Sequence, residues 1–170
     1  PDLPKLQISQ IEDFANLAAT IPELPWQKRE RYRRNYGLKD SDVEILVADR
    51  SLYSFFDAVA SVCLTDHALI QLAANYLLSD LDGLKKSGVL KIWPPAEDFA
   101  DLMHLVAAGD ISSRGAKDIL TVMVESGLPP REITTAKNLF QKSDETTLRD
   151  IVNQVIAKNP KVVADYQNGK

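Results

Sequence analysis

The chain has 170 residues, a formal net charge of −4 and a hydrophobic content of 45%, which are the proportions of an ordinary globular protein with one good core or two small ones. Its single cysteine excludes an intramolecular disulfide, and no apolar run reaches the roughly 18 residues that a membrane span requires. Together with a first segment that lacks the layout of a signal peptide, these features predict a cytoplasmic protein.

The first half of the chain is expected to be helical, since no run alternates with period two. Ser9 and Ser41 each start a capping box, and a helix from about Trp26 is expected to end at Gly37. Two longer helices follow, the second starting after Thr65 or Asp66. Their core-facing stripes recur at steps of three and four: Leu52, Phe55, Phe56, Val59 and Cys63, then Leu69, Ala73, Tyr76, Leu77, Leu81 and Leu84.

Pro94-Pro95 is the predicted internal boundary, because two prolines cannot lie inside a helix. Beyond it, one helix is expected to end at Gly109, and the next to begin at Ser112 or Ser113 and end at Gly127. The remaining predictions are a helical turn after Pro129-Pro130, a helix capped by Ser143 or Asp144 with Leu148, Ile151, Val152 and Val155 buried, and a last helix from Asn159-Pro160.

The predicted fold is therefore all-α, with two consecutive small helical bundles over residues 1–93 and 94–170, the second of them incomplete at its C-terminus. The negative charge is spread evenly: residues 1–93 carry 11 basic and 13 acidic side chains, and residues 94–170 carry 9 and 11. A protein that holds nucleic acid mainly through charge is usually basic, so any RNA contact is expected from a local patch and from shape.

The sequence contains no recognisable catalytic or metal-binding motif. Its histidines and cysteine are His67, His104 and Cys63, and no Walker, GxGxxG or GxSxG motif is present. Cys63 falls on an apolar stripe and is expected to be buried. We therefore expect no catalytic residue, cofactor site or metal ligand in this chain.

Two groups of basic residues are candidates for contact with RNA. The first, which we call the Arg-rich cluster, is interleaved with tyrosines and predicts either a phosphate-binding ridge or a structural helix face at a hinge: Lys28, Arg29, Arg31, Arg33 and Arg34. The second lies in a segment, 111–142, that carries five basic and three acidic residues. Its predicted RNA-binding residues, with backbone N–H groups at the helix start, are Ser112, Ser113, Arg114, Lys117, Lys137 and Lys142, and the alternative is a polar face that contacts nothing.

Several short motifs recur in an order and spacing that resemble the B subunit (GatB) of the tRNA-dependent amidotransferases, over its helical connector and its C-terminal GatB/YqeY domain. The motifs are Pro1-Asp2-Leu3-Pro4, Leu24-Pro25, Tyr36-Gly37-Leu38, Asp49-Arg50 with Tyr53, Ala73-Ala74-Asn75, Gly109-Asp110-Ile111-Ser112, Ala116-Lys117, Ser143-Asp144-Glu145 and Asn159-Pro160. The resemblance implies that residues 1–93 are the connector, which contains the Arg-rich cluster, and that residues 94–170 are the tail domain.

The resemblance further implies a non-catalytic, tRNA-binding part of an ATP-dependent carbon–nitrogen ligase. That enzyme converts Glu-tRNA(Gln) to Gln-tRNA(Gln) or Asp-tRNA(Asn) to Asn-tRNA(Asn), with ATP and Mg²⁺ held by residues upstream of Pro1. The implied partners are tRNA(Gln) or tRNA(Asn), the amidase that forms the A subunit of the complex, and its small C subunit, with no DNA and no membrane. The alternative, which the acidic balance favours, is a helical protein–protein module that docks on the amidase or the catalytic domain without RNA contact.

Overall fold

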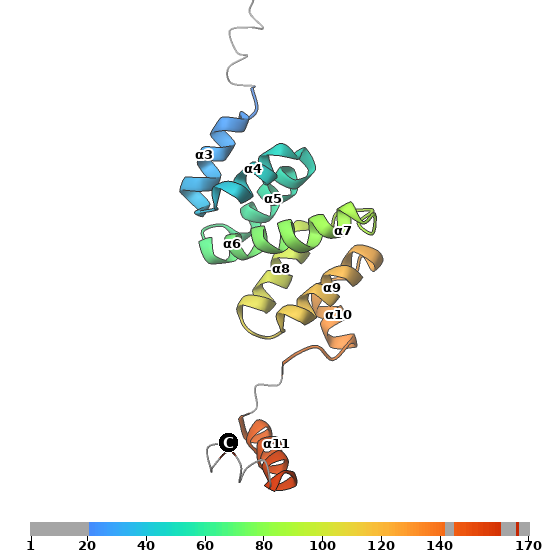
Figure 1. Cartoon of the computed structure of the whole chain (residues 1–170). Helices are drawn as coiled ribbons and strands as arrows, with labels where there is room; N and C mark the ends of the chain where they lie inside the picture. The colour runs from blue at the N-terminus through green and yellow to red at the C-terminus, as the bar shows by residue number, and fades with distance from the viewer. Residues whose placement is uncertain (1–20, 142–144, 161–165, 167–170) are drawn as a thin grey trace, which may run out of the picture.

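The computed structural model describes residues 21–141, 145–160 and 166, and every regular element in these ranges is a helix (Figure 1). The all-α prediction is confirmed. The elements are α3 Pro25–Tyr36, α4 Asp40–Ala48, α5 Arg50–Cys63, α6 His67–Tyr76, the π-helix η2 Leu77–Leu81, α7 Asp82–Lys86, α8 Ala96–Ala107, α9 Ser113–Ser126, α10 Pro130–Ala136 and α11 Glu145–Lys158.

The helix ends follow local chemistry. Gly37 ends α3 in the left-handed conformation (φ 64°), and Gly127 ends α9 in the same way (φ 70°), as the sequence predicted. Asp49 and Asp66 cap α5 and α6 by accepting backbone N–H bonds. The capping box predicted at Ser41 is wrong: the cap of α4 is Lys39, two residues earlier, and the helix begins at Asp40.

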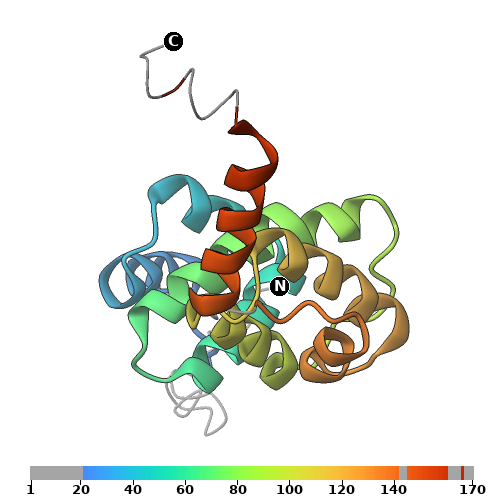
Figure 2. The same ribbon diagram turned by 90° about the horizontal axis from the view of Figure 1, so that it is seen from below.

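The hydrophobic core is built from the predicted stripes and runs without interruption through the segments on both sides of Pro94-Pro95. Helix α8 lies at its centre, packing against α5 and α6 from the first half of the chain and against α9 and α10 from the second. Figure 2, seen from below, shows α9 and α10 next to each other. The ring of Phe55 on α5 meets Phe99 on α8 edge-on, with ring centroids 5.3 Å apart. The division at residue 93 into two units stays a prediction.

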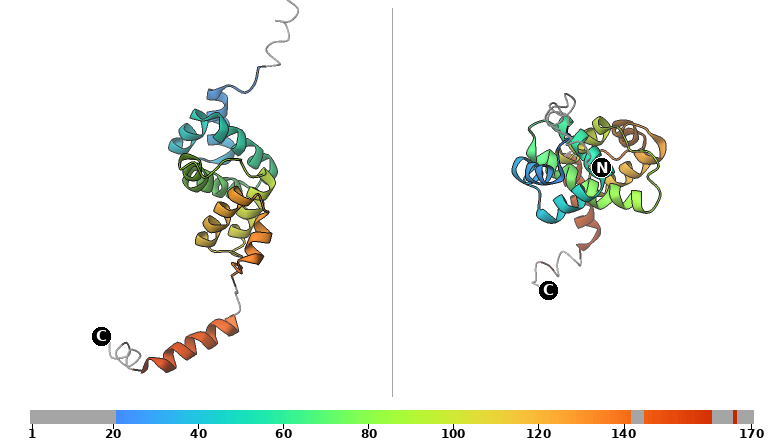
Figure 3. Two further views of the ribbon diagram at one scale, coloured as in Figure 1. Left: turned by 90° about the vertical axis from the view of Figure 1, so that its right-hand side faces the viewer. Right: turned by 90° about the horizontal axis from the view of Figure 1, so that it is seen from above.

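Helix α11 lies away from the other helices (Figure 3). Val152 and Val155, predicted to be buried, are 54% and 55% exposed, because no other described helix covers this face. The side chains of Leu148 and Ile151 lie outside the described residues. The capping box predicted at Ser9 and the cap predicted at Ser143 or Asp144 lie outside them too. The last predicted helix, from Asn159-Pro160, falls almost wholly outside them.

Candidate nucleic-acid interface

Hydrogen bonds at the start of α9 engage some of the backbone groups of the loop that precedes the helix and of its first turn. The Oγ of Ser112 accepts the N–H of Gly115 at 3.1 Å, which makes Ser112 the cap of α9. The backbone N–H of Gln141 donates to the carbonyl of Asp110 at 2.7 Å. With its amide nitrogen turned toward Gly109, Gln141 also accepts the N–H of Ser112 at 3.1 Å. The loop before α9 is therefore fastened to the chain that follows α10.

Ser113 and Arg114, which follow this cap, have hydrogen-bond donors that could bind an anion. Within the described residues, the backbone N–H groups of Ser113 and Arg114 have no hydrogen-bond partner, as is usual in the first turn of a helix. The Arg114 side chain is 89% exposed, and its Nε lies 3.9 Å from the Oδ2 of Asp118, at the limit of an ion pair. The start of α9 therefore presents N–H donors and a guanidinium to solvent.

The other predicted cations of this segment, Lys117, Lys137 and Lys142, differ in their ion pairing and in whether the structure describes them. Lys117, one turn further along α9, has its Nζ 2.8 Å from the Oδ1 of Asp80 on η2, and this bond raises the pKa of Lys117. Lys137 is exposed at the end of α10 and forms no ion pair within the described part of the chain. Lys142 lies outside the described residues. The structure therefore brings together Ser112, Ser113, Arg114 and Lys117 on one helix, with Lys137 on the neighbouring element.

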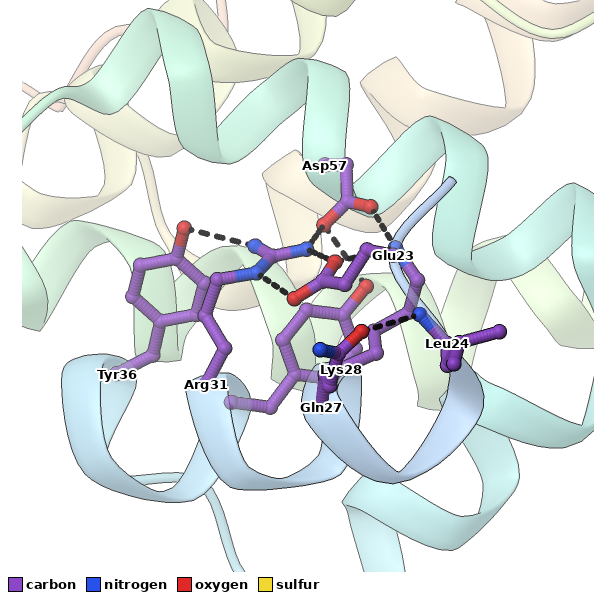
Figure 4. Close-up of polar contacts among 8 residues, drawn as sticks. Glu23, Leu24, Gln27, Lys28, Arg31, Tyr36 and Asp57 are labelled. Carbon is purple, nitrogen blue, oxygen red and sulfur yellow. Dashed lines mark hydrogen bonds and ion pairs between the residues drawn. The ribbon is translucent and has the colours of Figure 1, made fainter. Parts of the chain in front are cut away.

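Two cations of the Arg-rich cluster, Lys28 and Arg31, point toward Asp57 on α5 (Figure 4). The Nζ of Lys28, a residue only 7% exposed, lies 2.5 Å from the Oδ2 of Asp57 and 3.1 Å from Glu23. Arg31 bonds the same two carboxylates, at 2.6 Å to Glu23 and 2.9 Å to Asp57, and the hydroxyl of Tyr32 donates to Asp57 at 2.8 Å. Two positive and two negative side chains therefore neutralise one another between α3 and α5.

This network shifts the ionisation of its members. Hydrogen bonding to Arg31, opposed by partial burial, lowers the pKa of Glu23 to about 2. Burial, followed by the charge of Asp57, raises the pKa of the Tyr32 hydroxyl. The pKa of Arg31 is raised by its bonds to the two carboxylates. Glu23 and Arg31 therefore stay ionised at neutral pH.

The remaining cations of the Arg-rich cluster also have carboxylate partners. Arg29 bonds Glu44 through its Nε at 2.9 and 3.0 Å, and Arg33 bonds Asp40 at 2.5 Å. Arg34 lies 2.8 Å from Glu30, its i−4 neighbour. This arrangement favours the structural interpretation of the cluster over a phosphate-binding ridge.

The acidic partners of the cluster were missed by sequence reasoning, and only one left a local signal. Glu30 stands four residues before Arg34, a spacing typical of helical ion pairs. Asp57 is 29 residues from Lys28, and Glu44 is 15 residues from Arg29, so neither pairing could be read from neighbouring positions.

Outside these two basic groups, we looked for a reactive thiol, a metal-binding cluster and a membrane-spanning helix among the described residues. Cys63 is buried, as predicted, and burial raises the pKa of its thiol. Among the described residues, no three His, Cys, Asp or Glu side chains are grouped so that they could hold a metal ion. No described helix is long and apolar enough to cross a membrane.

Comparison with known proteins places these features in context. The family model of the GatB domain matches residues 54–170. The whole chain is 35% identical to the B subunit of the aspartyl/glutamyl-tRNA(Asn/Gln) amidotransferase of Thermomicrobium roseum, and 38% identical to the protein of that name from Rickettsia canadensis. The protein of that name from Gloeothece citriformis is 35% identical, again over the whole chain. The chain spans about a third of the length of these curated relatives, 34 to 35%.

Proposed function

This chain belongs to the GatB domain family, and on that premise we propose that it is the tRNA-binding tail region of the B subunit in a tRNA-dependent amidotransferase. The relatives carry the name of that subunit in the aspartyl/glutamyl-tRNA(Asn/Gln) amidotransferase. The complete enzyme would convert Glu-tRNA(Gln) or Asp-tRNA(Asn) to the amidated form, together with an amidase as its A subunit and a small C subunit.

The chemistry of that enzyme would take place outside this chain. ATP and Mg²⁺ would supply activation of the misacylated carboxylate, and the residues that hold them would lie upstream of Pro1. The described residues do not fit such a site, because they contain no cluster of carboxylates suited to a metal ion. The role proposed for this chain is binding and positioning of the tRNA.

The observation that carries the proposal is the juxtaposition at the start of α9. Arg114 and Lys117 share this helix with two N–H groups that have no partner within the described residues. The opposite face of α9 is fixed in the core by Ile119, Leu120 and Met123. A helix anchored in this way can present cations to an RNA backbone with little loss of entropy, which suits recognition of folded RNA by shape.

The tail would act by holding the tRNA body at a set position. Once the tRNA body is bound, its aminoacylated 3′ end no longer has to find the distant active site by free diffusion. The entropy lost in bringing the reactants together is then partly accounted for by the binding step. The net charge of −4 makes such binding depend on a few local contacts rather than on the field of the whole chain.

A second candidate function is a helical module that docks on the amidase or on the catalytic domain. The neutralised Arg-rich cluster favours it, since those cations are used inside the chain. Near the start of α3, Trp26 is 63% exposed and Ile21 is also exposed, as expected of a surface that meets protein.

The two functions are separated by titrating the chain with tRNA(Gln), tRNA(Asn) and a tRNA that is not a substrate, at several salt concentrations. A tRNA-binding tail is expected to prefer the substrate tRNAs, with a salt dependence that corresponds to roughly two to four phosphates. Absence of binding at low salt would contradict the proposal and leave the docking module as the better account.

A further inference from the structure

The ion pair between Lys117 and Asp80 joins two elements that are distant in sequence. Lys117 lies on α9, and Asp80 lies on the π-helix η2, with Nζ and Oδ1 2.8 Å apart. The Asp80 side chain is mostly buried, whereas that of Lys117 is half exposed. The pair therefore holds a cation of the candidate interface against a fixed carboxylate.

Asp80 lies on a π turn, and its carboxylate has two partners. The N–H of Asp82 bonds the carbonyl of Leu77, five residues earlier, which is the mark of a π turn. Because an α-helix turns about 100° per residue, the additional residue of a π turn changes which side chains face a neighbouring element. The second oxygen of Asp80, Oδ2, lies 2.5 Å from the Oγ of Ser79. Both carboxylate oxygens are thus engaged, one by Ser79 and one by Lys117.

We propose that Asp80 competes with RNA phosphate for Lys117 and thereby limits the affinity of this surface for polyanions. This inference rests on the proposed tRNA-binding function and identifies a residue that regulates it. A lysine paired with a carboxylate has no net charge as a pair, so a phosphate that binds there must compete with Asp80 for the Lys117 ammonium.

Arg114 provides the contrast on the same helix. Its Nε lies 3.9 Å from Asp118, and both side chains are exposed, so its charge is largely available. Arg114 would therefore make the first phosphate contact, and Lys117 would contribute only where an RNA backbone is held close enough to compete with Asp80. Asp80 would therefore lower the affinity of this surface most for RNA that does not approach Lys117 closely.

The test replaces Asp80 by its amide isostere. Asp80→Asn removes the charge, keeps the shape, and is expected to tighten binding of tRNA(Gln) by about two- to fivefold, the range of an exposed ion pair. The slope of log affinity against log salt is expected to steepen by roughly 0.7 to 0.9, which corresponds to one additional phosphate contact. The helical circular dichroism signal shows whether the variant is folded.

A double-mutant cycle assigns the effect to Lys117. In a Lys117→Gln background, Asp80→Asn is expected to change tRNA affinity and salt slope far less than it does alone. An equal gain in both backgrounds would overturn the inference, because the effect would then come from net charge. If the parent chain binds tRNA and Asp80→Asn binds no tighter, the inference also fails while the proposed function stands. If neither the parent chain nor Asp80→Asn binds tRNA, both fail.

Discussion

The Nζ of Lys28 on α3 lies 2.5 Å from the Oδ2 of Asp57 on α5, and this contact makes a residue of a basic run part of the interior. Lys28 also lies over the ring of Tyr53, with its Nζ 4.6 Å from the centroid. Both contacts tie α3 to α5, which in turn packs on the central helix α8.

Asp57→Asn is therefore expected to destabilise the chain. The variant leaves Lys28 buried with one carboxylate instead of two, and we expect the free energy of unfolding to fall by about 2 kcal/mol, below the cost of breaking a fully buried pair. Urea denaturation measures this change. Glu44→Gln is the matched control, since it removes an exposed partner of Arg29 and Arg33 and should cost less than about 1 kcal/mol. Equal costs for the two variants would show that the contacts of Asp57 with Lys28, Arg31 and Tyr32 stabilise the fold no more than an exposed ion pair does.

Glu23 makes the stability depend on acid pH. Its pKa is lowered from 4.5 to about 2, mainly by Arg31, so its ion pair stabilises the fold above the unfolded-state pKa and is lost as the pH falls from about 4.5 to about 2. The parent chain is expected to exceed Glu23→Gln in stability by no more than about 1 kcal/mol at neutral pH, because solvent screens the pair. Denaturation midpoints measured across this pH range should converge near the lower limit. A constant difference at all pH values would contradict the assignment.

Reversal of two exposed charges tests the candidate interface. Lys117→Glu would place a carboxylate against Asp80, so Arg114→Glu with Lys137→Glu is the better pair. We expect tRNA affinity to fall roughly tenfold, with a shallower salt dependence and unchanged circular dichroism. Arg34→Glu with Lys39→Glu is the control in the other basic segment and should leave affinity unchanged. The reverse result would move the RNA contact to the Arg-rich cluster.

Two glycines are expected to respond in opposite directions to alanine. Gly37 has φ +64°, and a Cβ there would lie 2.9 Å from the Nε2 of Gln71, so Gly37→Ala should lower the free energy of unfolding by about 1 to 2 kcal/mol. Gly83 lies inside α7 with nothing within 4 Å of an added methyl group, so Gly83→Ala should raise it by about 0.5 to 1 kcal/mol. Thermal denaturation of both variants measures the sign, and a shared sign would contradict the difference in backbone strain.

The reaction rate of the Cys63 thiol measures how accessible this part of the core is to solvent. Since it is buried and its pKa is raised, we expect an aromatic disulfide reagent to react with it slowly at neutral pH in the folded chain and rapidly in urea. Rapid reaction without denaturant would show that the end of α5 opens readily.

Local features of the fold could be predicted from the sequence because they depend on residues within one or two helical turns. The stripe of Leu52, Phe56 and Val59 placed one face of α5 in the core, and Gly37 and Gly127 marked helix ends. The start of α9 was predicted in the same way at Ser112 or Ser113, and the structure has Ser112 as its cap. The family resemblance also followed from short motifs in order, and the match over residues 54–170 confirms it.

Tertiary structure alone decided which charges remain available to a partner. Lys28 and Arg114 are both basic residues on predicted helices, yet one is buried against Asp57 and the other is almost fully exposed. An apolar stripe likewise predicts burial only where a second element covers it, and Val155 on α11 has none among the described helices. Burial and ion pairing depend on atoms that approach from distant parts of the chain, and a pattern of neighbouring residues does not specify that approach.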